Sequence, residues 1–211
     1  EIGKFLKKKY FINLTPSKAG EYIVPYINKK KIPFISNLIT CGGQTSIPII
    51  KEIHQVLKKK LKYVELVSSI SSKSAGAATR ENINEYIIST ESAIKQLTRV
   101  KDTKVIININ PSDPPINMMN SLFFELSKPL NKRNFSQINT RIKHINKIIK
   151  SYIPNYNAKI FPQIEKKILR ITIRVVGQGD YLPSYAGNLD IITSSAVHLA
   201  KKIYEKKRIN N

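Results

Sequence analysis

The chain has 211 residues, and 36 Lys and Arg against 14 Asp and Glu give it a formal net charge of +22. Its apolar content of 41% excludes wholesale disorder, and no stretch approaches the roughly 20 uninterrupted apolar residues of a membrane span. One Cys excludes an internal disulfide framework and indicates a reducing, cytoplasmic compartment. We therefore expect one large or two small globular domains.

The positive charge has two explanations. A basic surface is typical of nucleic-acid binding. However, Lys, Ile and Asn together make up about two fifths of the chain, far above ordinary usage, and Lys is scattered through every segment. This pattern favours a coding bias and a solvated surface over a nucleic-acid site, and we expect no nucleic-acid partner.

In the first half of the chain, short apolar runs that predict strands alternate with segments whose apolar residues have helical spacing. Residues 10–14 predict a strand, and a second apolar run covers residues 35–40. Pro48 suits a first helical turn, so we expect a helix over residues 48–59, followed by a buried strand at 63–69. Residues 71–79 form a loop of small residues, and a long helix follows over residues 80–100.

The second half of the chain also contains both predicted strands and predicted helices. Strands are predicted at residues 104–109 and 122–126, with a rigid Pro-rich turn at 111–115 between them. Residues 136–152 show helical spacing of Ile, at positions 138, 142, 145 and 149. Residues 168–175 alternate apolar side chains, including Ile168 and Ile171, with Arg170, Thr172 and Arg174, as in a strand with one solvated face. A final helix is expected over 189–207, and the fold class is α+β.

Cys41 is the first candidate for chemistry. It is followed by Gly42 and Gly43 and lies just before the helix predicted at Pro48. Backbone N–H groups at a helix start stabilise a thiolate and lower the thiol pKa, and the glycines would let N–H groups converge on an oxyanion. The alternative is that Cys41 is a small buried apolar residue.

Two loops are further candidates. The small residues from Ser74 to Arg80 precede a helix, where free N–H groups could hold a phosphate or amide group, although an ordinary capped turn explains them equally well. The Gly-rich and Pro-rich residues 177–190 join a strand to the last helix, so they either turn or bind. His54, His144 and His198 lack metal-ligand spacing, so no metal site is expected. Glu81, Glu85 and Glu91 are expected to solvate one helix.

Six blocks carry a family resemblance. They are LTPSKAGEYIVPYIN (14–28), TCGGQTSIP (40–48), SSISSKSAG (68–76), TRENINEY (79–86), NPSDPPI (110–116) and GDYLPSYAGNLDIITSSA (179–196). In sequence and order they resemble the acylating acetaldehyde dehydrogenases. The resemblance implies a fold like glyceraldehyde-3-phosphate dehydrogenase and conversion of acetaldehyde, NAD and coenzyme A to acetyl-CoA and NADH, in the catabolism of aromatic hydrocarbons.

The resemblance also assigns roles. It implies that Cys41 is the nucleophile that forms an acyl thioester, and that coenzyme A accepts the acyl group. The NAD-contacting positions that it implies are Ser74, Ala75, Gly76, Ala77, Ala78, Thr79, Arg80, Glu81, Asn82 and Asn188. The implied partners are 4-hydroxy-2-oxovalerate aldolase and a second copy of the chain in a homodimer.

The chain departs from the family at its start. Members begin with a nucleotide-binding unit that carries a Gly-rich fingerprint, and this chain contains no such motif. We expect residues 1–38 to be a remnant of that Rossmann-type domain. Residues 39–188 would form the catalytic and dimerisation domain, and residues 189–211 a helix that packs back on the nucleotide-binding domain. An alternative is a truncated, inactive paralogue retained as an aldolase-interacting protein.

Overall fold

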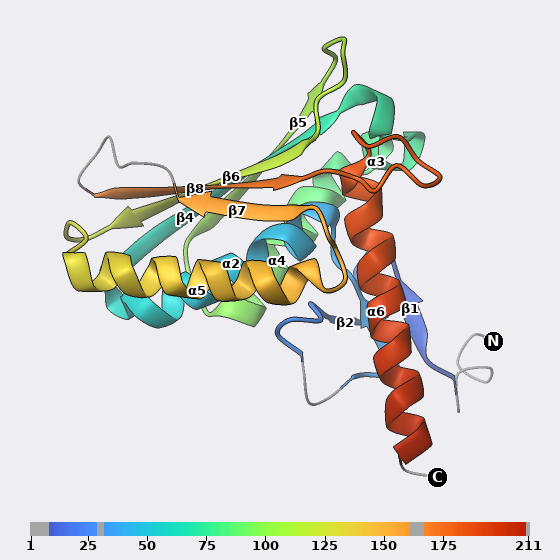
Figure 1. Ribbon diagram of the computed structural model, residues 1–211, viewed down its shortest axis with the longest axis horizontal. Coiled ribbons are helices and arrows are strands. Elements are labelled where there is room, and N and C mark those ends of the chain that lie inside the picture. Colours follow the sequence, from blue (N-terminus) through green and yellow to red (C-terminus); the bar gives the residue numbers. More distant parts are fainter. Residues whose placement is uncertain (1–8, 29–31, 161–166, 210–211) are drawn as a thin grey trace.

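The computed structural model describes residues 9–28, 32–160 and 167–209. The described residues form two sheets, five α-helices and two short 3-10 turns, in a mixed α/β architecture (Figure 1). The elements in order are β1 (Phe11–Asn13), β2 (Glu21–Tyr22), β3 (Ile35–Asn37), α2 (Cys41–Leu57), η1 (Lys58–Lys60), β4 (Leu61–Ser71), η2 (Ser72–Ser74), α3 (Ala77–Glu81), α4 (Ile83–Thr98), β5 (Thr103–Asn110), β6 (Met118–Leu126), α5 (Lys132–Lys150), β7 (Tyr156–Ile160), β8 (Ile168–Val175) and α6 (Gly187–Ile209).

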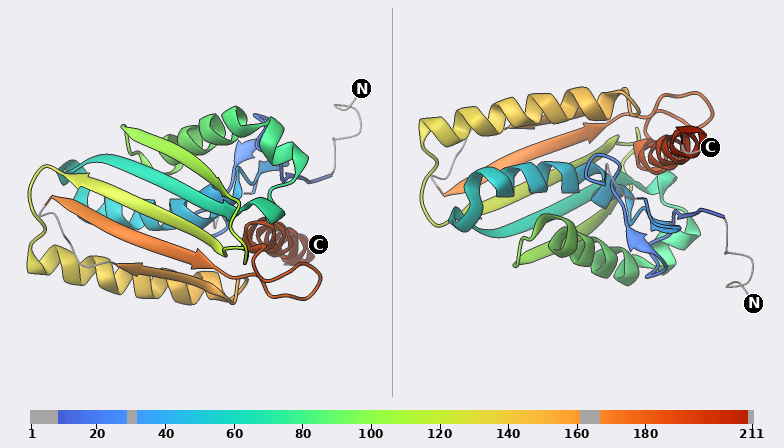
Figure 2. Two further views of the ribbon diagram at one scale, coloured as in Figure 1. Left: turned by 90° about the horizontal axis from the view of Figure 1, so that it is seen from above. Right: turned by 90° about the horizontal axis from the view of Figure 1, so that it is seen from below.

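The larger sheet has the order β5-β4-β6-β8-β7, with β4 and β5 parallel and the other neighbours antiparallel. Helices α2, α4 and α5 cover one face, and the opposite face is uncovered in the two views of Figure 2. Side chains of the strands alternate accordingly. In β4, Val64, Leu66, Ser68 and Ile70 are buried under the helices, whereas the residues between them are partly exposed.

Helix α2 lies at the centre of the helical layer, where it contacts α4, α5, α6, β4 and β6. Its N-cap is Thr40, whose side chain accepts a hydrogen bond of 2.9 Å from Gly43 N. Farther along, the Glu52 carboxylate accepts hydrogen bonds from Tyr26 Oη at 3.1 Å and from the Arg141 guanidinium. These contacts tie the central helix to the N-terminal segment and to α5.

The smaller sheet has the order β1-β3-β2, and both of its strand pairs are parallel. Ile23 and Leu38, beside these strands, form a small apolar cluster with Leu199 of α6. Figure 1 shows α6 running from the larger sheet past β1 and β2. The last helix therefore joins the two sheets.

Most of the predicted elements are confirmed. The Ile positions 138, 142, 145 and 149 are all buried in α5, as their spacing predicts. The strands β4, β5 and β6 and the helix α6 cover the predicted segments, with β4 and β6 extending beyond them, whereas β1 includes only residues 11–13 of the strand predicted at 10–14. In β8 the exposed residues are Arg170 and Arg174, but the buried row begins at Leu169 rather than Ile168, and Thr172 is buried as well.

Two helix predictions are wrong at their starts. Helix α2 begins at Cys41 and contains Pro48, because the Thr40 cap and the burial of residues 42–50 support a helix before the proline. The helix predicted over 80–100 is broken at Asn82, whose φ of −117° and ψ of 36° are not helical. Arg80 therefore belongs to α3.

Two strands had no signal strong enough to predict them. They are β2, which has two residues, and β7, whose sequence YNAKI lies at the sheet edge.

The division of the chain at residues 38 and 188 stays a prediction, as does the packing of 189–211 on a nucleotide-binding domain. Within the described ranges, no helix combines the length and apolarity that crossing a membrane requires.

We expect Leu199→Ala to detach α6 from the smaller sheet. Leu199 is fully buried against Ile23 and Leu38, so its truncation leaves a cavity that costs about 2–3 kcal/mol. Urea unfolding followed by circular dichroism measures the loss. Val197→Ala is the control, because Val197 is 54% exposed and its truncation should change the unfolding free energy by less than about 0.5 kcal/mol. Equal losses in the two variants would contradict this packing.

Candidate functional site

A cavity of about 410 Å³ lies where α2, α4, α6 and the segment after β1 meet. Its lining is Leu14, Thr15, Pro16, Ser17, Ile39, Thr40, Cys41, Ile70, Thr79, Asn82, Glu85, Tyr86, Asn188, Leu189 and Ile192. Cys41, Thr79, Asn82 and Asn188, which the sequence analysis names as the nucleophile and NAD-contacting positions, thus line one cavity. It is mainly apolar, with hydroxyl and amide groups at a few positions.

Cys41 is the first residue of α2, and its side chain is half-buried. Its Sγ lies 3.7 Å from Tyr86 Oη of α4. The same Tyr86 Oη accepts a hydrogen bond of 3.1 Å from Gly42 N and donates one of 3.1 Å to Ser68 Oγ of β4. The thiol is therefore held at the meeting point of the central helix, α4 and the sheet.

The thiol pKa does not follow the sequence expectation. Burial raises the pKa of Cys41, although the hydrogen bonds from Tyr86 and from the backbone N–H of Gly42 lower it. Desolvation of the charged form thus outweighs the stabilisation of a thiolate at a helix start. The free Cys41 side chain is a neutral thiol at neutral pH rather than an activated thiolate.

The glycines after Cys41 serve the packing of the protein itself. A Cβ at Gly42 would overlap Tyr86 Oη and would lie 2.5 Å from Ser68 Oγ. The two N–H groups are also used internally, because Gly42 N donates to Tyr86 Oη and Gly43 N donates to Thr40 Oγ1. The expectation that these amides converge on an oxyanion is therefore wrong.

Asn188, in the first turn of α6, meets the predicted binding loop directly. Its Nδ2 donates to Ser74 O at 3.1 Å, and Ser74 Oγ donates to Ser71 O at 3.0 Å. Asn188 is only 4% exposed, and its Oδ1 has no hydrogen-bond partner. An acceptor is thus buried without a partner in a residue that lines the cavity, and a bound amide or hydroxyl donor would satisfy it.

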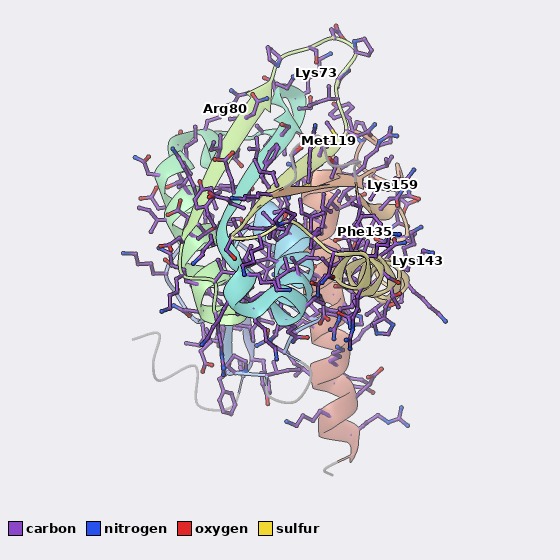
Figure 3. All side chains as sticks on the ribbon, turned by 90° about the vertical axis from the view of Figure 1, so that its left-hand side faces the viewer. Lys73, Arg80, Met119, Phe135, Lys143 and Lys159 are labelled. Atoms are coloured by element: carbon purple, nitrogen blue, oxygen red, sulfur yellow. The ribbon has the colours of Figure 1, made fainter. Side chains whose placement is uncertain are left out.

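The remaining positions of the 74–82 segment differ in their surroundings. Ala75 is buried, Gly76, Ala77 and Glu81 are exposed, and Ala78 lies within α3. Arg80 points back to its own loop, with Nη2 donating to Ser72 O and Oγ and Nε donating to Ala75 O. Figure 3 places Arg80 near Lys73, at the end of the molecule that carries the β5–β6 connection. The Arg80 guanidinium braces this loop.

Sequence reasoning missed Tyr86 and Ser68 as members of the site. Tyr86 lies 45 residues from Cys41 along the chain, and its position within a helical pattern indicates burial only. The three predicted solvating carboxylates also diverge. Glu85 lines the cavity, while Glu91 accepts a hydrogen bond of 3.0 Å from Val105 N. Among the described residues, no three His, Cys, Asp or Glu side chains are grouped so that they could hold a metal ion.

The chain is similar to known proteins over most of its length. Residues 41–183 match the family described as prokaryotic acetaldehyde dehydrogenase, dimerisation. An acetaldehyde dehydrogenase of Pectobacterium atrosepticum is 40% identical over 199 residues, which are 92% of this chain and 66% of the relative. One from Burkholderia thailandensis is 39% identical over 203 residues, 95% of this chain and 67% of the relative. The chain thus spans about two thirds of the length of these curated relatives.

We expect Gly42→Ala to destabilise the first turn of α2. The new methyl group would overlap the Tyr86 hydroxyl, which hydrogen bonds to Gly42 N and Ser68 Oγ hold in place, so overpacking costs about 2 kcal/mol. Thermal and urea unfolding measure the effect. Gly76→Ala is the matched control, since a Cβ there meets no atom within 4 Å and should cost less than about 1 kcal/mol. A stable Gly42→Ala protein would show that the contact is not tight.

Proposed function

Because the chain belongs to the acetaldehyde dehydrogenase family, we propose that it supplies the catalytic part of an acetylating acetaldehyde dehydrogenase with Cys41 as the nucleophile. The observation that supports this proposal is the half-buried thiol on the wall of a mainly apolar cavity. A cavity of about 410 Å³ accepts a small aldehyde together with part of a larger ligand.

In this proposal, Cys41 Sγ attacks the carbonyl carbon of acetaldehyde. A C–S bond forms, and the carbonyl oxygen takes up a proton to give a thiohemiacetal on Cys41. Loss of a hydride from that carbon and of the hydroxyl proton leaves an acetyl thioester. The sulfur of coenzyme A, after its thiol loses a proton, attacks the thioester carbonyl; the bond to Cys41 breaks, acetyl-CoA forms, and the Cys41 thiolate takes up a proton. Sulfur suits both roles, because it is a strong nucleophile and a good leaving group toward another thiol.

The residues around Cys41 fit a nicotinamide group. NAD, the implied cofactor, would accept the hydride when bound in this cavity. The unpartnered Asn188 Oδ1 can accept a hydrogen bond from an amide N–H such as that of the nicotinamide carboxamide. Thr79 and Asn82 line the same cavity and offer further polar groups to the ligand.

The acyl-transfer half of the reaction can be tested without NAD. Incubation with acetyl-CoA should transfer one acetyl group to the chain and release coenzyme A, which intact-protein mass spectrometry and peptide mapping would locate at Cys41. Cys41→Ser should carry no acetyl group, and NADH formation from acetaldehyde, NAD and coenzyme A should fall at least about 10³-fold in that variant. Acetylation of Cys41→Ser to the same extent as the parent chain would contradict the proposal.

We also propose that the uncovered face of the larger sheet pairs with a second copy of the chain. The matched family is described by its dimerisation, and the matched residues include every strand of this sheet. One row across the open face consists of Ile106, Val67, Ser121, Thr172 and Lys159, which are register partners on neighbouring strands. These mostly small or uncharged side chains at the sheet centre suit close contact with another protein surface.

Ser121→Arg should therefore convert the dimer into a monomer. It places a bulky cation at the centre of the open face, beside the exposed Arg170 and Arg174, and the like charges and lost fit disfavour association. Sedimentation velocity measures the molecular mass. Ser136→Arg, on the exposed surface of α5, is the matched control and should leave the mass unchanged. A Ser121→Arg protein that keeps the dimer mass would move the interface elsewhere.

A further inference from the structure

The hydroxyl of Tyr86 lies within hydrogen-bonding distance of the Cys41 thiol. It lies 3.7 Å from Cys41 Sγ and 3.1 Å from both Gly42 N and Ser68 Oγ. Tyr86 is buried, and Ser68 is fully buried beneath it. The missing side chain at Gly42 allows the approach, because a Cβ there would occupy the position of the hydroxyl.

The Tyr86 hydroxyl can donate one hydrogen bond and accept two. A Tyr hydroxyl has one proton to donate and two lone pairs, and the Gly42 N–H occupies one lone pair. While Cys41 is a thiol, its S–H can donate to the other lone pair as Tyr86 donates to Ser68 Oγ. After the thiol loses its proton to water, Tyr86 can donate to the sulfur and Ser68 can donate to Tyr86. Rotation of two hydroxyl groups accommodates both states without movement of heavier atoms.

We propose that Tyr86 is a positioning residue that stabilises the Cys41 thiolate, with Ser68 as the relay that frees the Tyr86 proton for the sulfur. The proposal rests on the proposed function of Cys41 as a nucleophile. It assigns Tyr86 no role as a base. The thiol proton leaves to solvent, and Tyr86 keeps its own proton throughout.

The charges around the site agree with this role. Burial raises the pKa of Tyr86 well above its usual value, and the nearby Cys41 charge raises it further, so the hydroxyl stays protonated over the working pH range. Burial also raises the pKa of Cys41, and the hydrogen bond from Tyr86 is the largest effect that lowers it. Besides Cys41 and Tyr86, the titratable side chain in the described cavity lining is that of Glu85.

The single Cys of the chain permits a direct test. The rate of alkylation by iodoacetamide, measured from acidic to alkaline pH, reports the thiolate fraction of Cys41 and requires neither NAD nor coenzyme A. Tyr86→Phe should move the rate profile upward by about one pH unit and slow alkylation near neutral pH about tenfold, since the thiolate loses a hydrogen bond. Ser68→Ala should move it in the same direction by a smaller amount.

Tyr156→Phe is the matched control. Tyr156 is also fully buried and donates to α2, at Thr45 O with 2.9 Å, but no hydrogen bond joins it to the thiol in the described structure. Its profile should match that of the parent chain. If Tyr86→Phe and Tyr156→Phe give the same profile, the proposal is overturned. If Tyr86→Phe does not fold, Ser68→Ala decides, and an unchanged profile for that variant overturns the proposal.

The same measurements separate this inference from the proposed function. A shifted profile in Tyr86→Phe, with no acetylation of the parent chain by acetyl-CoA, would leave the thiolate contact standing and remove the dehydrogenase assignment. Acetylation of Cys41 in the parent chain, with no shift of the alkylation profile in Tyr86→Phe, would support the dehydrogenase assignment and overturn the role of Tyr86. In an active protein, Tyr86→Phe should lower the rate of acetylation near neutral pH and recover most of it at alkaline pH.

Discussion

The first turn of α2 is fixed by close packing that only glycine allows. Gly42 has no side chain, so the Tyr86 hydroxyl of α4 and the Ser68 hydroxyl of β4 reach the backbone of the turn. Thr40 caps the same turn from the other side and also bonds to Thr90 of α4 at 2.8 Å. The position of Cys41, and with it the wall of the cavity, follows from these contacts.

This packing imposes a trade-off on the thiol. The contacts that position Cys41 also remove it from water, and desolvation raises its pKa more than the helix start and the neighbouring donors lower it. A half-buried neutral thiol resists oxidation and unwanted alkylation, because the thiolate is the reactive form. Reactivity then depends on groups that favour the thiolate, and the hydroxyls of Tyr86 and Ser68 are placed to do so.

The sequence predicted elements with strong periodicity and missed features that depend on distant contacts. Four Ile at helical spacing located α5, and alternation located β8. The start of α2 was misplaced because Pro48 is a strong local signal, whereas the Thr40 cap and the burial that overrides the proline are tertiary. Similarly, Cys41 and Asn188 could be named from their motifs. Tyr86 could not, since its role arises from a contact between α4 and the start of α2.

Strand β4 links the cavity to the open face of the sheet. Ser68 points under the helices and supports Tyr86, whereas Val67 and Ser69, its neighbours in sequence, lie on the opposite face. Side chains on a strand alternate with a period of two, so a register shift of one residue would exchange the two sets. Ser68 pairs with Asn120 of β6 and Ile107 of β5, and these register contacts hold it under Tyr86. The geometry at Cys41 therefore depends on the pairing of the central strands as much as on the helices that surround the thiol.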